Sequence, residues 1–253
     1  MSALSVQLYS VRDSLRKDPA ATLERLAAAG FDEVEPFDLV EWAPRLEEPL
    51  RTTGLRARTG HASLLTAPDL PVIFDAAARL GITTVIEPTV RDGWQDLRGV
   101  ATIADSLNHC AERASSHGLT IGYHNHWWEF TRLAGTTALE QLAGMLHPPV
   151  VLELDVYWAA VGGADVTTLA TGLAGQIRHL HVKDGPIEQD PASQVPAGTG
   201  RVDLAGVLAA VPGATRVLEF DAYAGDVFAA LAEGAAWVRT QTEPPADAQT
   251  EEA

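Results

Sequence analysis

The chain has 253 residues, of which 46% are hydrophobic, so it is long enough to bury a sizeable core. Its 18 Lys and Arg residues face 34 Asp and Glu, and the net charge of −16 argues against nucleic acid or an anionic membrane as a partner. A single cysteine, Cys110, excludes an intramolecular disulfide and a CxxC metal or redox site. Since neither a leader nor an apolar run of membrane-spanning length is evident, we expect a soluble, cytoplasmic protein.

Short apolar runs alternate with amphipathic segments along the chain. At the first helix, Asp18 supplies an N-cap, Pro19 occupies the first helical position and Gly30 ends the helix. The predicted strands cover residues 5–9, 31–36, 55–61, 82–87, 119–123, 150–155, 177–183 and 216–220. The predicted helices cover residues 20–29, 39–53, 71–80, 97–117, 137–146, 166–174, 203–211 and 227–240.

Eight strands alternating with eight helices, in units of roughly 30 residues, predict an α/β protein with a single (β/α)8 TIM barrel. A doubly wound open sheet is the alternative, but the turn after the first strand lacks a glycine-rich fingerprint and the sequence contains no P-loop. We place the barrel at residues 1–241. Residues 242–253, rich in Pro, Ala and Glu, are predicted to form a disordered acidic tail.

Histidines gather at the predicted strand ends. The fifth strand leads into Gly122-Tyr-His-Asn-His-Trp-Trp-Glu-Phe130, where a period of two residues places His124 and His126 on one face. Two imidazoles at this spacing can reach one ion or one ligand. His61, His179 and His181 also lie on predicted strands, whereas the other three histidines lie in or beside helices. Because TIM-barrel active sites lie at strand ends, this distribution favours a functional site there.

The next three strands continue the pattern. They place Asp155, His181 and Glu219 at heights that match His124, and these four residues form a mixed nitrogen and oxygen set suited to one divalent ion. For each residue alone, a structural ion pair or a polar barrel layer is the simpler explanation. Four coinciding strand ends favour the metal site, since buried carboxylates need a cation or hydrogen bonds to compensate them.

Further candidates lie at the remaining strand ends and in the loops that follow. Glu35 and Glu87 end strands and are expected either to act directly or to support the site. Glu129 and Lys183 are candidate acid/base or substrate-orienting groups. Tryptophans in these loops can pack the barrel rim or stack on a sugar ring. The predicted substrate-binding residues are His61, Glu87, His126, Trp128 and Trp158.

Six short motifs follow one another along the chain. They are Gln7-Leu-Tyr-Ser-Val-Arg12, Tyr123-His-Asn-His126 with Glu129-Phe130, Leu154-Asp-Val-Tyr-Trp158 followed by Gly162-Gly163, His181-Val-Lys-Asp184, Gly198-Thr-Gly200 and Leu218-Glu-Phe-Asp221. In this order they resemble the xylose-isomerase-like TIM-barrel sugar phosphate isomerase/epimerase superfamily. The resemblance extends to about Arg239. It is specific for fold and metal site, but not for substrate.

The resemblance implies one divalent ion, Mn²⁺ or Mg²⁺ first and Zn²⁺ or Co²⁺ as alternatives. By motif its ligands match His124, Asp155, His181 and Glu219. Ketose epimerases place a glutamate at the first of these positions and use two metal-bound glutamates for proton transfer, whereas this sequence keeps only Glu219. Alignment with the Glu-Asn of such relatives makes His124 the ligand and leaves His126 to face the substrate, although period-two geometry alone allows the reverse.

The resemblance also implies a small-molecule sugar or cyclitol as substrate and a reaction that starts by removing a proton next to a metal-polarised carbonyl. We expect an isomerase or epimerase. Because a Tyr-His-x-His motif also resembles inosose dehydratases, a dehydratase or lyase is the alternative. Glu219 is the favoured base and Lys183 the group that stabilises or protonates the oxyanion, with Glu129 and Glu153 as alternative acids.

Two other functions fit less well. A catalytically inactive sugar-binding barrel would need broken metal ligands, and this set is intact. An apurinic endonuclease would need additional histidine ligands and a basic surface, but Trp158 stands where a ligand histidine is expected and the net charge is −16. The sequence leaves a homo-oligomer open.

Overall fold

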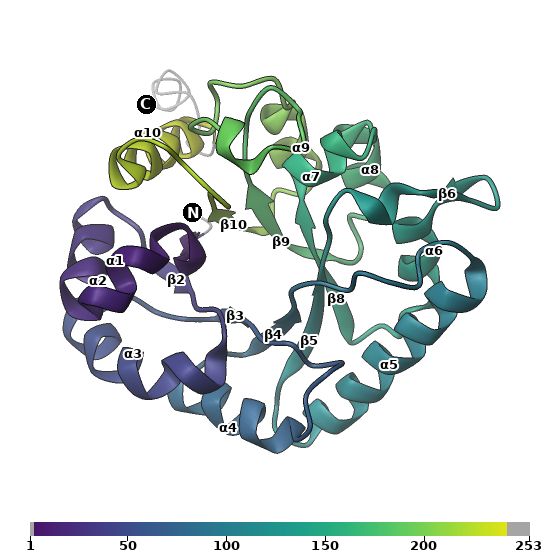
Figure 1. The fold of residues 1–253 in the computed structure, drawn as a ribbon, viewed down its shortest axis with the longest axis horizontal. Coiled ribbons are helices and arrows are strands. Elements are labelled where there is room, and N and C mark those ends of the chain that lie inside the picture. The colour runs from purple at the N-terminus through teal and green to yellow at the C-terminus, as the bar shows by residue number, and fades with distance from the viewer. Residues whose placement is uncertain (1–2, 242–253) are drawn as a thin grey trace, which may run out of the picture.

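The computed structural model describes residues 3–241, so the tail predicted at residues 242–253 lies outside the described residues. Eight parallel strands form a nearly closed TIM barrel, as the sequence predicted (Figure 1). The barrel strands are β1 (Leu4–Gln7), β2 (Glu33–Glu35), β3 (Thr59–His61), β4 (Thr84–Glu87), β5 (Thr120–His124), β8 (Val150–Asp155), β9 (Ile177–Val182) and β10 (Thr215–Leu218).

Helices surround the barrel (Figure 1). The eight predicted helices correspond to α2 (Pro19–Ala28), α3 (Leu39–Thr53), α4 (Leu70–Leu80), α5 (Leu97–Ser115), α6 (Ala138–Met145), α8 (Val166–Gly172), α9 (Leu204–Ala210) and α10 (Val227–Thr240). The sequence did not predict α1 (Arg12–Lys17), α7 (Val156–Val161), the turns η1 (Leu8–Val11), η2 (Trp128–Phe130) and η3 (Pro191–Ser193), or the hairpin of β6 (Arg132–Leu133) and β7 (Thr136–Thr137). Most of these additions lie in the loops after strands, where a TIM barrel builds its active site.

The barrel closes between β2 and β3, the two ends of the strand order β2-β1-β10-β9-β8-β5-β4-β3. The third strand is shorter than predicted, and Arg56, just before it, forms a single parallel bridge with Glu33. The N–H of Val34 donates to the carbonyl of Arg56 at 2.8 Å, and the N–H of His61 donates to the carbonyl of Pro36 at 2.8 Å. These two backbone hydrogen bonds join the segments of β2 and β3 where the barrel closes.

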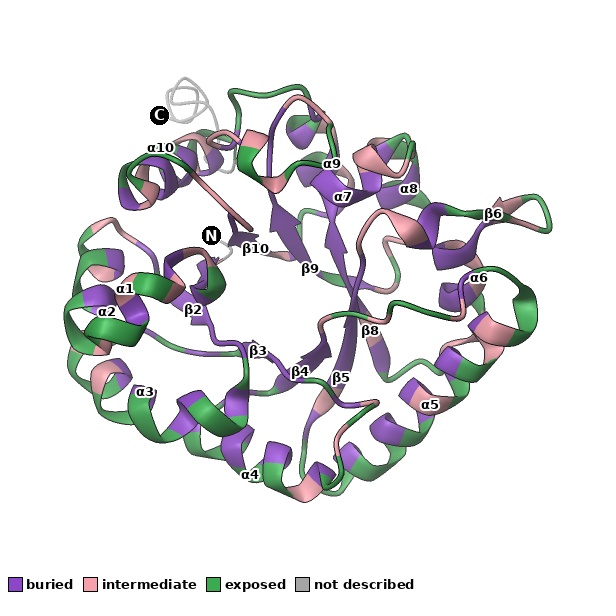
Figure 2. Ribbon diagram, in the orientation of Figure 1, coloured by how far each residue is buried: buried purple, intermediate pink, exposed green. Residues whose placement is uncertain are grey.

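Alternate residues of the strands face two different environments. Leu152 and Leu154 of β8 belong to the hydrophobic core, whereas Glu153 and Asp155 are fully buried on the opposite face. The helices bury their inner faces and expose their outer ones (Figure 2). No helix within residues 3–241 is long and apolar enough to cross a membrane. The apolar layer between strands and helices therefore frames a barrel interior that carries charged groups.

Candidate active site

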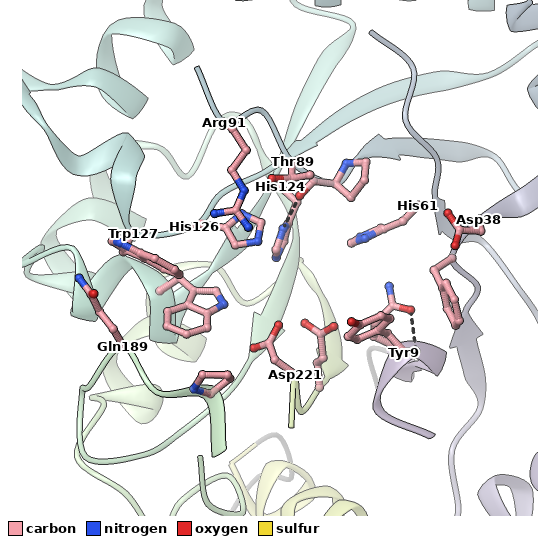
Figure 3. Close-up of a pocket in the computed structure, with 16 residues that line it drawn as sticks. Tyr9, Asp38, His61, Thr89, Arg91, His124, His126, Trp127, Gln189 and Asp221 are labelled. Carbon is pink, nitrogen blue, oxygen red and sulfur yellow. Dashed lines mark hydrogen bonds between the residues drawn. The ribbon is translucent and has the colours of Figure 1, made fainter. Parts of the chain in front are cut away.

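A cavity of about 450 Å³ opens at the carboxyl ends of the strands (Figure 3). His61 and His124, at the ends of β3 and β5, line it together with Glu219, which follows β10. Loops after the strands supply the remaining walls, among them Tyr9, Phe37, Asp38, Thr89, Arg91, His126, Trp127, Trp158, Gln189 and Asp221. The cavity thus lies where this fold places its active sites.

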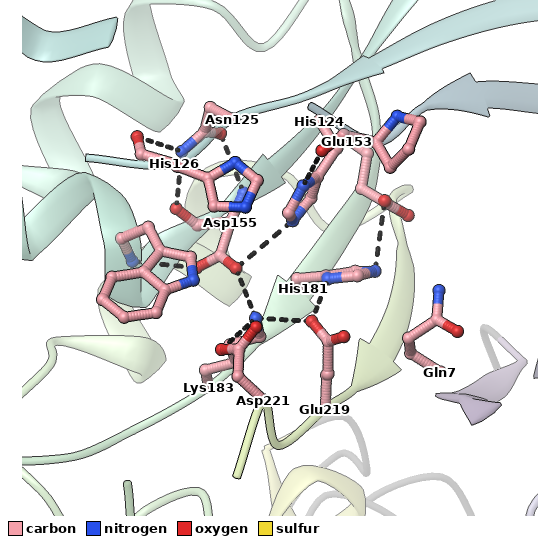
Figure 4. Close-up of polar contacts among 12 residues, drawn as sticks. Gln7, His124, Asn125, His126, Glu153, Asp155, His181, Lys183, Glu219 and Asp221 are labelled. Atoms are coloured by element: carbon pink, nitrogen blue, oxygen red, sulfur yellow. Dashed lines mark hydrogen bonds and ion pairs between the residues drawn. The ribbon is translucent and has the colours of Figure 1, made fainter. Parts of the chain in front are cut away.

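The four residues predicted as metal ligands meet beside this cavity. Ligand atoms of His124, Asp155, His181 and Glu219 all lie within 4.8 Å of one another, and all four side chains are buried. Nε2 of His124 lies 3.3 Å from Oδ2 of Asp155 (Figure 4). Nδ1 of His181 lies 2.8 Å from Oε2 of Glu219 but makes no hydrogen bond. Two imidazoles and two carboxylates offer the mixed nitrogen and oxygen ligands that suit a divalent ion, and their role as ligands stays a prediction.

Lys183 places a positive charge against the same carboxylates (Figure 4). Its Nζ lies 2.9 Å from Asp155 Oδ2, 2.5 Å from Glu219 Oε2 and 2.8 Å from Asp221 Oδ2. Burial alone would lower the pKa of Lys183, but the three carboxylates hold it well above its usual value. Burial alone would likewise raise the pKa of Asp155, yet Lys183 and His124 lower it to about 2. Both groups are therefore charged at neutral pH.

A second ionic cluster lies deeper in the barrel and shares His181 with the first. Nε2 of His181 lies 2.8 Å from Glu35 Oε1 and 3.1 Å from Glu153 Oε2. His61 Nε2 contacts Glu153 Oε2 at 2.7 Å, and Gln7 donates to Glu35 at 2.9 Å. Burial alone would lower the pKa of His61, but Glu35 and Glu153 raise it to about 10. Carboxylates on Nε2 orient the imidazole of His181 and so direct its Nδ1 toward Glu219.

Asn125, between His124 and His126, joins the ends of two neighbouring strands. Its side chain accepts from the N–H of Asp155 at 3.0 Å and donates to the carbonyl of Asp155 at 3.1 Å, which fastens the end of β5 to the end of β8. Oδ1 of Asp155 also accepts from the N–H of Trp158 at 2.9 Å and caps α7. The carboxylate is thus fixed by backbone contacts before it meets any ligand.

Glu129 stands behind the cavity wall instead of in it. Its carboxylate accepts from the hydroxyl of Tyr123 at 2.7 Å and from the N–H of His126 at 3.0 Å. Burial raises the pKa of Glu129 to about 8, against hydrogen bonds that lower it. Glu87 is similarly placed: it accepts from the N–H of Leu65 at 2.9 Å, and burial raises its pKa. Both carboxyl groups therefore hold loops that line the site.

Aromatic rings form one wall of the cavity. His126 stacks on Trp128 with ring centroids 4.3 Å apart and an angle of 11° between the planes. Trp127 and Trp158 extend this wall, with centroids 4.9 Å apart. Nδ1 of His126 and Nε1 of Trp158 are buried without a hydrogen-bond partner within residues 3–241, which leaves both for a bound molecule. Burial, followed by the charge of His124, lowers the pKa of His126 to about 2, so its imidazole is neutral.

The predicted residues thus divide into three groups. His61, His124, His126, Trp158 and Glu219 line the cavity. Asp155, His181 and Lys183 contact that lining from within the barrel. Glu87, Glu129, Glu153 and Trp128 support it from behind. Sequence reasoning missed Arg91 and Asn125; the second could have been found from its place between two strand-end histidines, whereas the first lies in a loop without periodicity.

A parallel eight-stranded barrel with a polar cavity at its strand ends defines a TIM-barrel protein with an enzyme-like site. The family model of the xylose isomerase-like TIM barrel matches residues 23–241, and the chain belongs to this family. No curated protein matches the chain.

Solved structures with the same fold share little sequence with this chain. A sugar phosphate isomerase/epimerase from Parabacteroides distasonis ATCC 8503 is 22% identical, with a TM-score of 0.81 and coverage of 96% of this chain and 94% of that one. A probable 3-DHS dehydratase from Bacillus anthracis is 16% identical, with a TM-score of 0.73 over 94% and 98% of the two chains. A xylose isomerase-like protein from Mycobacterium smegmatis, in complex with magnesium, is 14% identical, with a TM-score of 0.71 over 96% and 97%.

Proposed function

We propose that the chain is a cytoplasmic, divalent-metal-dependent isomerase or epimerase that acts on a small sugar by removing a proton next to a carbonyl. The observation that carries this proposal is the meeting of His124, Asp155, His181 and Glu219 beside the cavity, with ligand atoms within 4.8 Å of one another. Membership of the xylose isomerase-like family and the likeness to a sugar phosphate isomerase/epimerase support it.

His124, Asp155, His181 and Glu219 would hold the ion. Mn²⁺ or Mg²⁺ fits this set, with Zn²⁺ or Co²⁺ as alternatives, and the magnesium complex of a structural neighbour supports the first pair. When bound, such an ion supplies a Lewis acid that polarises the substrate carbonyl and raises the acidity of the neighbouring C–H.

Glu219 is the base in this proposal. Burial alone would raise its pKa, but Lys183 and His181 hold the pKa of Glu219 well below its usual value. Such a carboxylate is a weak base, so it can take a proton only from a carbon whose acidity a polarised carbonyl has raised. Lys183, 2.5 Å from Glu219 Oε2, would then stabilise the negative charge that develops on the substrate oxygen. His126 and Trp158, each with an unpartnered nitrogen, would orient the substrate hydroxyls.

A dehydratase or lyase is the second candidate, and one observation favours it. Glu219 is the single glutamate among the four proposed ligands, so the paired glutamates of an epimerase are absent from this set. The neutral imidazole of His126 lies beside His124, with ring centroids 5.1 Å apart. Its unpartnered Nδ1 could orient the leaving hydroxyl group, which would depart as water with the proton that Glu219 takes from the carbon next to the carbonyl.

One experiment separates these outcomes. The Mn²⁺-loaded protein would be incubated in D₂O with a panel of keto-sugars and inososes and followed by NMR. Exchange of the proton next to the carbonyl, without a change of mass beyond deuterium, supports the isomerase or epimerase; loss of water supports the dehydratase. If no member of the panel exchanges a proton or loses water, and Glu219→Gln binds Mn²⁺ as tightly as the native protein, the proposal is wrong.

A further inference from the structure

Arg91 stands out among the residues that line the cavity because nothing in residues 3–241 neutralises it. It follows β4 in a loop, and Figure 3 shows its side chain reaching toward the cavity above His126, on the side opposite Tyr9 and Asp38. Its guanidinium carbon lies 4.1 Å from the centroid of the Trp128 ring. Within the described residues it makes neither a hydrogen bond nor an ion pair. All five of its N–H donors are thus available.

The loop that carries Arg91 is held in place by two tryptophans. The carbonyl of Val90 accepts from Nε1 of Trp94 at 2.8 Å and from Nε1 of Trp128 at 2.8 Å. Trp128 therefore fixes both the backbone beside Arg91 and the plane on which its guanidinium stacks. A guanidinium whose face is covered and whose edge is free is oriented for two parallel hydrogen bonds to a carboxylate or phosphate.

The charges around the cavity make this position unusual. Asp38, Glu219 and Asp221 also line the cavity, and Arg91 is the one lysine or arginine among the described residues that line it. Glu219 and Asp221 share the single charge of Lys183, which also contacts Asp155. No carboxylate of the described residues lies within ion-pair distance of Arg91, so its guanidinium has no counterion there, in a chain of net charge −16.

We propose that Arg91 forms a subsite for an anionic substituent, a carboxylate or a phosphate, on the sugar substrate; this inference rests on the proposed function. The position of Arg91 along the aromatic wall determines which end of the substrate Arg91 binds. Arg91 contacts Trp128, Trp128 stacks on His126, and His126 lies beside His124 with ring centroids 5.1 Å apart. The anionic group therefore lies at the end of the substrate remote from the carbon that exchanges its proton.

The test compares Arg91→Met with Arg45→Met in the Mn²⁺-loaded protein. Arg45 is the matched control because it also stacks on an indole, with its guanidinium carbon 4.2 Å from the ring of Trp42, but it does not line the cavity. Calorimetry would measure binding of inorganic phosphate, glycolate and glycerol. We expect Arg91→Met to weaken binding of phosphate or glycolate about tenfold or more, with Arg45→Met like the native protein. Whichever anion shows the larger loss identifies the substituent.

Kinetics give the second measurement. For a keto-sugar phosphate or keto-sugar acid, Arg91→Met should raise KM at least about tenfold with little change in kcat, whereas Arg45→Met should leave both quantities at their native values. Equal anion binding by the native protein and Arg91→Met would overturn the subsite, even if proton exchange still supported the proposed function. Loss of anion binding in Arg91→Met, together with no turnover of any sugar, would keep the subsite and overturn the proposed function.

Discussion

Nζ of Lys183 lies 2.9 Å from Oδ2 of Asp155, an atom that also lies 3.3 Å from Nε2 of His124. The lysine therefore contacts a carboxylate that we propose as a metal ligand. A buried ammonium and a metal ion can share such a carboxylate, but each reduces the negative charge that the other meets. Lys183 should accordingly set both the stability of the metal-free protein and its affinity for metal.

We predict that Lys183→Met destabilises the metal-free protein by about 3–5 kcal/mol, because three buried carboxylates lose their cation. Added Mn²⁺ should restore more stability to this variant than to the native protein, since the ion then meets a more negative site. The measurement is urea denaturation in EDTA and in excess Mn²⁺. Lys17→Met is the control: Lys17 is the other lysine of the chain and is exposed.

The same variant tests the catalytic role. In the metal-loaded state, Lys183→Met should lower kcat roughly a hundredfold, as the loss of one oxyanion-stabilising group typically does. A folded, metal-loaded variant with native kcat would remove Lys183 from the mechanism and return the role to another group of the site.

Asp155→Asn should abolish stoichiometric metal binding while preserving the fold. Asparagine can still accept from the N–H of Trp158 and cap α7, but it removes the negative charge that would offset the ion. Elemental analysis after dialysis against Mn²⁺ measures the outcome.

The matched control for that variant is Asp165→Asn. Asp165 caps α8 by accepting from the N–H of Thr168 at 2.9 Å, the same distance as at Asp155, and it is exposed. It should bind metal like the native protein. Retention of one Mn²⁺ per chain by Asp155→Asn would place the metal elsewhere.

Much of this site could be predicted because strands repeat every two residues. Apolar runs ending in His124, Asp155, His181 and Glu219 marked four strand ends, and parallel strands bring such ends to one side of a barrel. The ionic cluster of Glu35 with His181 could not be derived, since residues so far apart meet only through the barrel's register and closure.

Loops offered no comparable signal. Glu129 was predicted as an acid/base or substrate-orienting group, and the turn η2 directs its carboxylate toward the hydroxyl of Tyr123. Arg91 carries no periodic pattern, and its position depends on two tryptophans that bind one carbonyl. Single-residue geometry in loops is set by such tertiary contacts, not by local sequence preference.

Glu129 should make stability depend on pH. Burial raises its pKa from 4.5 to about 8, so the folded protein holds a proton that the unfolded chain releases in this range. The stabilisation is complete below about pH 4.5 and is lost as the pH rises to about 8. We expect Glu129→Gln, which keeps one acceptor for the N–H of His126, to flatten the pH dependence between these limits by a few kcal/mol.

Urea denaturation of metal-free protein at several pH values would measure this difference. Glu24→Gln, an exposed change on α2, provides the control and should follow the native curve. Parallel curves for Glu129→Gln and the native protein would show that Glu129 ionises normally in the folded state.

Asp184 organises the loop that follows β9. Its Oδ2 accepts from the N–H groups of Gly198 at 3.0 Å and Gly200 at 2.9 Å, and its Oδ1 accepts from those of Gly185 at 2.9 Å and Val202 at 3.1 Å. A Cβ at Gly200 would lie 2.1 Å from Asp184 Oδ1, which explains why a glycine is needed there. The loop closed by these bonds carries Gln189 and Pro191 to the cavity wall.

Asp184→Asn would turn an NH₂ group toward two of these four N–H donors and leave them buried without an acceptor. We expect a loss of stability of about 1–3 kcal/mol and a larger effect on KM than on kcat, because the loop lines the cavity but contributes none of the proposed proton-transfer groups. Hydrogen exchange at Gly198, Gly200 and Val202 should accelerate in the variant. The control is Asp190→Asn in the same loop. Asp190 accepts from one exposed N–H at 3.0 Å, so this change should alter none of these quantities appreciably. Native exchange rates in Asp184→Asn would mean that the loop is held by its other contacts, such as the bond from the N–H of Arg201 to the carbonyl of Gly185 at 3.0 Å.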